Sequence, residues 1–79
     1  MTASSNKTLR IYCPDESTMR EALMWLQEFW REEVPSPTTW EPDPDDGGSW
    51  GIFADGANQD LYDDLLEVFE GRLEAEWEE

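Results

Sequence analysis

The chain has 79 residues, and its 20 acidic side chains outnumber its 5 basic ones, which gives a formal net charge of -15 at pH 7. This length allows one domain with a modest core and leaves little room for a catalytic pocket. An apolar share of 38%, with five Trp, favours a folded domain over a disordered acidic tail. Nucleic acid and anionic membranes are poor direct partners, because both repel this charge and no basic patch is present. The expected partner is a basic protein surface.

The single cysteine, Cys13, excludes an intramolecular disulfide and is typical of a reducing compartment. No apolar run approaches the length of a membrane span, and the polar start of the chain lacks the apolar core of a signal peptide. We therefore expect a cytoplasmic protein, in the host cell if a phage encodes it. Residues 1–7 should form a flexible N-terminus and residues 8–79 a single acidic α+β domain.

The first half of the chain predicts a strand followed by a helix. Residues 8–13 alternate, with Leu9 and Ile11 on one face, and Pro14 closes this strand. Thr18 and Glu21 have the spacing of a capping box, although Ser17 or Asp15 could also cap the helix. Pro35 should end it. The apolar stripe expected to form the core consists of Met19, Ala22, Leu23, Leu26, Phe29, Trp30 and Val34.

Residues 35–48 hold four of the five prolines, which excludes a helix and allows at most an edge strand around Trp40. Asp46-Gly47 predicts a turn, residues 49–54 predict a short strand, and Asp55-Gly56 predicts the next turn. A hairpin between Trp40 and Phe53 is therefore expected.

Asn58 can cap a second helix over residues 59–77, in which Gly71 would cost about 1 kcal/mol relative to Ala. Its apolar stripe would be Leu61, Tyr62, Leu65, Phe69, Leu73 and Trp77. The predicted fold class is α+β, a single small domain of order β-α-β-β-α with two helices packed on a short antiparallel sheet.

The second predicted helix carries the functional argument, because its acidic residues fall within about a third of the circumference. Neighbouring like charges destabilise a helix by about 0.2–0.5 kcal/mol per pair, and acids at the helix C-terminus oppose the macrodipole. Several departures from helix-stabilising charge placement, all of them adding negative charge, indicate a functional surface. The residues on this face are Asp60, Asp63, Asp64, Glu67, Glu70, Glu74 and Glu78. A second row of candidate partner-binding residues comprises Asp43, Asp45, Asp46 and Asp55, with Glu41 beside them.

The acidic residues are also compatible with other interpretations. A charge run on a helix is often only a solvated face, and an acidic halophilic proteome would give the same composition. Asp43 to Gly48 faintly resembles a calcium loop, but Gly47 occupies its fifth position and Ala54 stands where the closing Glu belongs. With no His and one Cys, zinc sites and nucleophile–base pairs lack their residues. We therefore expect no metal, no cofactor and no enzymatic activity.

Met24 and Trp25 lie outside the central stripe of the first predicted helix. They could cover the sheet or a loop, form a dimer contact, or anchor a partner. Whether the protein is a monomer or a homodimer stays open.

In its length, its charge, its compact α+β layout and its row of carboxylates from Asp60 to Glu78, the chain resembles the small acidic inhibitors that bacteriophages direct against host defence, the anti-CRISPR and anti-restriction proteins. Several of these are DNA mimics. The resemblance implies that the target is the basic DNA-binding surface of a CRISPR-Cas complex or a restriction enzyme, which the chain would block. The alternative is an antitoxin or immunity protein that neutralises a basic nuclease or toxin. A third reading is a halophilic housekeeping domain that folds only in molar salt.

Overall fold

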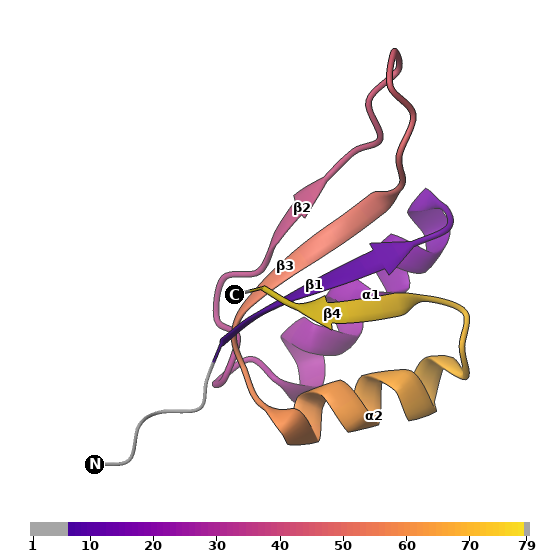
Figure 1. Cartoon of the computed structure of the whole chain (residues 1–79). Coiled ribbons are helices and arrows are strands. Elements are labelled where there is room, and N and C mark those ends of the chain that lie inside the picture. Colours follow the sequence, from indigo (N-terminus) through magenta and orange to yellow (C-terminus); the bar gives the residue numbers. More distant parts are fainter. Residues whose placement is uncertain (1–6, 79) are drawn as a thin grey trace.

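The computed structural model describes residues 7–78, which form an α+β domain of order β-α-β-β-α-β (Figure 1). The elements are β1 (Lys7–Cys13), α1 (Glu16–Phe29), β2 (Thr38–Trp40), β3 (Trp50–Ala57), α2 (Gln59–Phe69) and β4 (Glu74–Trp77). The predicted fold class is confirmed, and β4 is a strand that the sequence did not predict. Of the N-terminal segment predicted to be flexible, residues 1–6 lie outside the described residues, and Lys7 already belongs to β1.

The four strands form one antiparallel sheet in the order β2-β3-β1-β4, so the first strand lies in the middle. Each helix connects two strands that are separated by a third, the split β-α-β arrangement of ferredoxin-like domains. Many unrelated functions use this fold, so function has to be argued from the surface.

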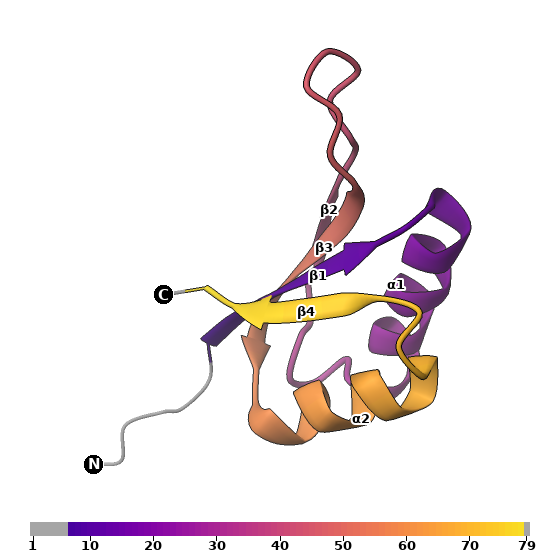
Figure 2. The ribbon, with the colours of Figure 1, turned by 45° about the vertical axis from the view of Figure 1, so that its right-hand side comes forward.

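Both helices cover one face of the sheet, as the two views in Figures 1 and 2 show. Leu9 and Ile11 of β1 and Ile52 of β3 are fully buried on this face, packed with Leu26 of α1 and Leu65 of α2. Because side chains alternate along a strand, the intervening residues project from the other side. We call that uncovered side the open face.

Helix α1 begins one turn earlier than a Thr18 cap would place it. Asp15 is the N-cap, and its Oδ1 accepts a hydrogen bond from the Thr18 backbone N–H at 2.8 Å. The helix ends at Phe29, and the chain turns at Trp30, whose carbonyl accepts a bond from the Val34 N–H at 2.8 Å. Val34 therefore reaches the core from outside the helix, whereas Phe29, predicted to be in the core, is 67% exposed.

The predicted hairpin is confirmed, with Thr38 opposite Phe53 and Trp40 opposite Gly51. The turn at Asp46-Gly47 is also confirmed. The turn predicted at Asp55-Gly56 is wrong, because β3 continues to Ala57. Gly56 has φ +99° and is the extra residue where the pairing with β1 shifts register, which makes it a bulge rather than a turn.

Helix α2 begins as predicted, with the Asn58 side chain accepting a bond from the Leu61 N–H at 2.9 Å. It ends at Phe69 and not at Trp77, because Glu70 and Gly71 both adopt left-handed backbone conformations, with φ of 49° and 81°. Gly71 therefore serves as a helix terminator, a position that glycine favours. The residues after it alternate in pattern and pair with β1 as an edge strand.

Candidate partner-binding surface

Most carboxylates of the domain have no cationic partner. The described part of the chain contains 19 of the 20 acidic residues, all except Glu79. Within that part, only three ion pairs form: Arg10 with Glu76 at 3.9 Å, Arg20 with Glu16 at 2.7 Å and Arg72 with Glu21 at 3.5 Å. The remaining carboxylates make the surface strongly negative.

Four of the predicted residues form a row on α2, which we call the helix row. It consists of Asp60, Asp63, Asp64 and Glu67, and Glu70 follows at the C-cap. All lie away from the buried side of the helix, and only Asp64 is partly covered. At 1.5 Å rise per residue the row spans about 10 Å, or about 3.5 Å per charge along the axis. The phosphates of one DNA strand are spaced about 3.4 Å apart along the duplex axis.

Glu74 and Glu78 do not lie on this helix, so the prediction of a seven-residue helical row is wrong. Because the chain reverses at Gly71, Glu74 belongs to β4, opposite Tyr12, and Glu78 follows the strand, with its N–H bonded to the Thr8 carbonyl at 2.9 Å. In β4, Glu74 and Glu76 project from the open face, whereas Ala75 and Trp77 project toward the helices.

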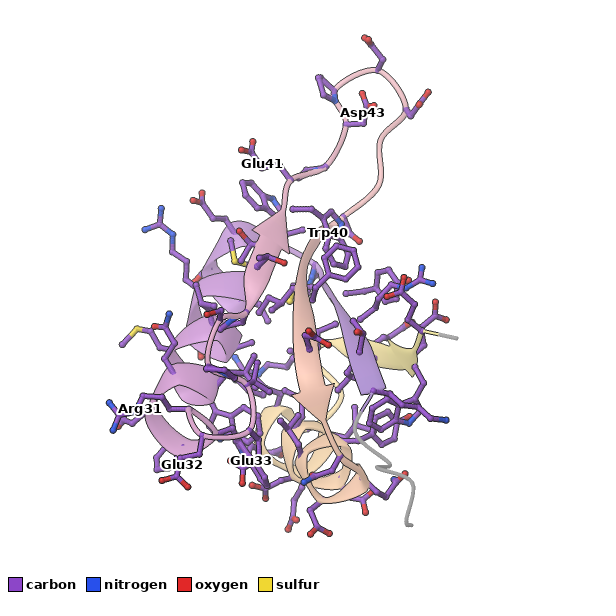
Figure 3. All side chains as sticks on the ribbon, turned by 90° about the vertical axis from the view of Figure 1, so that its left-hand side faces the viewer. Arg31, Glu32, Glu33, Trp40, Glu41 and Asp43 are labelled. Atoms are coloured by element: carbon purple, nitrogen blue, oxygen red, sulfur yellow. The ribbon has the colours of Figure 1, made fainter. Side chains whose placement is uncertain are left out.

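The acids of the β2–β3 hairpin form a separate group. The hairpin projects beyond the body of the domain, and Figure 3 shows Glu41 and Asp43 along it, with Glu32 and Glu33 at the opposite end of the molecule. The Asp43 Oδ1 accepts bonds from the backbone N–H groups of Asp45 at 2.8 Å and Asp46 at 3.4 Å. Asp43 therefore stabilises its own turn. Among residues 7–78, no group of three or more His, Cys, Asp or Glu side chains is arranged to hold a metal ion.

The predicted partner-binding residues therefore fall on three surfaces. The helix row lies on the layer that covers one side of the sheet, and Asp43, Asp45 and Asp46 lie on the hairpin. Asp55 lies on the open face, where it accepts a bond from the Thr8 hydroxyl at 3.1 Å. The fold brings the helix row together but separates it from Asp55 and Glu74.

The open face also carries Tyr12, Trp40 and Phe53, which we call the aromatic trio; the sequence predicted a hairpin between Trp40 and Phe53 but not a shared surface with Tyr12. The Trp40 ring lies 5.6 Å from the Tyr12 ring and 4.7 Å from the Phe53 ring, measured between centroids. A side chain at Gly51 would overlap the Trp40 ring, so this glycine lets the indole lie against β3. The alternation of the first predicted strand could have placed Tyr12 on this face, because Tyr12 is out of phase with Leu9 and Ile11.

One member of the trio, Tyr12, also borders a hollow of about 530 Å³ at the end of β1. Its lining includes Tyr12, Pro14, Ser49, Leu73, Glu74 and Glu76. The Tyr12 hydroxyl donates to the Glu76 Oε2 at 2.8 Å, and this bond raises the pKa of Tyr12 above its usual value. The hydroxyl also accepts a long bond of 3.4 Å from Arg10.

Trp25 is partly buried against α2, with its ring 6.0 Å from that of Phe69. Trp25 therefore packs against the other helix, whereas the three roles expected for it were covering the sheet or a loop, a dimer contact and a partner anchor. Met24 is 64% exposed. Phe29 and Val68, near the C-terminal ends of α1 and α2, are 67% and 45% exposed. A groove between α1 and α2 is lined by Trp25, Phe29, Trp30, Asp64 and Val68.

Cys13 is buried, and burial raises the pKa of its thiol to about 11. The side chain is therefore a protonated thiol at neutral pH, which makes it a poor nucleophile. In residues 7–78, none of the helices is long and apolar enough to cross a membrane. No protein family model, no curated protein and no solved structure matches the chain.

Proposed function

We propose that this protein is a non-enzymatic inhibitor that binds the basic DNA-binding surface of a host-defence complex, a CRISPR-Cas assembly or a restriction enzyme, and blocks DNA binding by mimicry. The observation that carries the proposal is the excess of carboxylates without a cationic partner, arranged on α2 as the helix row. We place it in the cytoplasm, where such complexes work and where a lone cysteine stays reduced.

The mechanism has two parts, steered encounter and occlusion. A surface of one sign raises the rate of association with a basic groove, and the effect weakens as salt rises. The helix row then presents carboxylates at about the axial spacing of phosphates on one strand, so lysine and arginine side chains that hold a DNA backbone can contact it. DNA cannot enter a groove that is already filled.

The proposal needs no catalytic group and no cofactor. General acid–base catalysis by two carboxylates requires environments that separate their pKa values, usually through burial. The helix-row residues Asp60, Asp63 and Glu67 are exposed, which suits electrostatic contact rather than proton transfer.

Competition with DNA tests the proposal. Purified CRISPR surveillance complexes and restriction enzymes are each loaded with a fluorescent duplex, and the chain is titrated while anisotropy is followed at about 50 and 200 mM salt. We expect the natural chain to release DNA from one of these proteins, and to do so less well at the higher salt. Lysozyme, a basic protein that does not need DNA, serves as a specificity control.

Two variants with the same change in charge separate the helix row from the rest of the surface. The first carries Asp60→Lys, Asp63→Lys and Glu67→Lys. The second carries Glu28→Lys, Glu32→Lys and Glu33→Lys, which lie in α1 and just after it. We expect the first to lose displacement and the second to retain most of it. Equal loss in both, or equally tight binding to lysozyme, would show general polyanion behaviour and contradict mimicry.

The antitoxin or immunity alternative predicts a different result with the same reagents. The chain would then inhibit one small basic nuclease and release no DNA from the defence complexes.

A further inference from the structure

The open face of the sheet combines aromatic rings and carboxylates at one place, the hollow beside Tyr12. Tyr12 belongs both to the lining of the hollow and to the aromatic trio, and its ring meets that of Trp40 edge to face beside the hollow. Glu74 and Glu76 of β4 border the same hollow. The helix row also borders aromatic rings, since Asp64 lines the groove with Trp25, Phe29 and Trp30, but there only one carboxylate takes part.

The negative charge of the hollow is only partly balanced by the chain itself. Arg72 also lines it, but its guanidinium contacts Glu21 at 3.5 Å and lies 5.2 Å from the centre of the Phe69 ring. Arg10 is 3.9 Å from Glu76, a long contact. Among residues 7–78, Glu74 has neither an ion pair nor a side-chain hydrogen bond. The Glu74 carboxylate can therefore pair with a cationic group of another molecule.

We propose that this hollow binds an arginine side chain of the basic partner, with the guanidinium paired to Glu74 and stacked against the aromatic trio. The inference rests on the proposed function for the sign of the partner and adds where and how one of its residues is held. A guanidinium is planar, stacks on aromatic rings and is less strongly hydrated than an ammonium, so arginine suits this site better than lysine.

Aromatic residues on the face of a four-stranded sheet can also stack the bases of single-stranded RNA. The charges around the trio argue against that occupant. Glu74, Glu76 and Asp55 project from the same face, and they would repel a phosphate backbone. Charge complementarity therefore selects a cationic side chain, and RNA becomes an outcome that the test can reveal.

A ligand with one guanidinium tests the site without engaging the rest of the acidic surface. N-acetyl-arginine amide is titrated into ¹⁵N-labelled full-length protein at low salt, and the shift of the Trp40 indole N–H gives the dissociation constant. N-acetyl-lysine amide and a short oligo-uridine RNA are titrated in parallel. We expect a saturable shift with the arginine ligand, weaker binding of the lysine ligand and no shift with RNA.

Matched variants then locate the contact. Glu74→Gln should weaken arginine binding about fivefold, near the upper end for an exposed ion pair, since Glu74 is exposed. Glu67→Gln removes the same charge from the helix row and should change the affinity by less than about twofold. Trp40→Ala should weaken binding roughly two- to fivefold through the lost stacking, read from the Tyr12 backbone amide instead, with circular dichroism to verify folding.

Three results would overturn the inference: no saturable shift with the arginine ligand, equal weakening by Glu74→Gln and Glu67→Gln, or saturable binding of the RNA at the trio. None of these decides the proposed function, because DNA displacement by the helix row is measured separately. Failure of the natural chain to displace DNA, with its arginine binding intact, would overturn the proposed function alone.

Discussion

Replacing Gly51 with alanine should destabilise the domain through one contact, the overlap between the new methyl group and the Trp40 ring. The three atoms nearest to that methyl group all belong to the Trp40 ring, and Gly51 has an ordinary backbone conformation for a strand residue. The substitution would force the indole away from β3, because a ring cannot share space with a side chain.

The magnitude follows from the two ring contacts that Trp40 would lose. Its pairs with Tyr12 and Phe53, at 5.6 and 4.7 Å between centroids, are each worth about 0.5–1.5 kcal/mol. Their loss should lower the free energy of unfolding by about 1–3 kcal/mol. For a domain of this size, that corresponds to a fall in Tm of roughly 5–20 °C.

The assay is a double-mutant cycle measured by urea unfolding, with Gly51→Ala made in the natural chain and in a Trp40→Ala background. Once the ring is absent, the methyl group no longer meets its three nearest atoms, and alanine should be neutral or slightly stabilising, since glycine costs about 0.5–1 kcal/mol within a strand. If Gly51→Ala costs the same with and without the indole, the contact is not the cause and the reasoning is refuted.

Three further predictions concern charge and titration. Raising salt from about 0.01 to 1 M shortens the Debye length from about 30 to 3 Å and should raise Tm, because repulsion among the carboxylates is screened; a chain that is unfolded until molar salt is present would support the halophilic reading instead. Hydrogen bonding from the Thr18 N–H lowers the pKa of Asp15, so this cap should stabilise the fold above pH 3.8 and lose its effect as pH falls through the lower, folded value. The stability difference from Asp15→Asn, which cannot titrate, should therefore shrink in acid, and a constant difference would contradict the assignment. Cys13, with a buried thiol of pKa about 11, should resist Ellman's reagent at pH 8 until the chain is unfolded in guanidinium, whereas rapid labelling of the native protein would show that it is accessible.

The glutamates of β4, Glu74 and Glu76, also have a structural role. In an edge strand, glutamates alternating with apolar residues discourage pairing with another sheet edge, which is a purely structural benefit. Glu76 additionally holds the Tyr12 hydroxyl. In the proposed mimicry, the phosphate-like track is therefore the helix row alone. The glutamates of β4 have their proposed role in binding through their position beside the hollow.

Several features of the domain were determined by local sequence. The alternation around Leu9 and Ile11 predicted β1, Asn58 predicted the start of α2, and the hairpin between Trp40 and Phe53 followed from the prolines and Asp46-Gly47. These signals act over a few residues, through side-chain periodicity, capping hydrogen bonds and restricted backbone angles. The excess of negative charge, and with it the sign of the expected partner, needs no structure.

Tertiary structure decided where the helix stopped and which side chains met. Gly71 reads as a tolerated helical glycine or as a terminator, and only the pairing of the following residues with β1 selects the second, because the strand gains backbone hydrogen bonds and buries Leu73. The aromatic trio joins three strands across up to 41 positions of the chain, from Tyr12 to Phe53. Its existence depends on strand order and register, which arise from packing the whole core and are not encoded in any one segment.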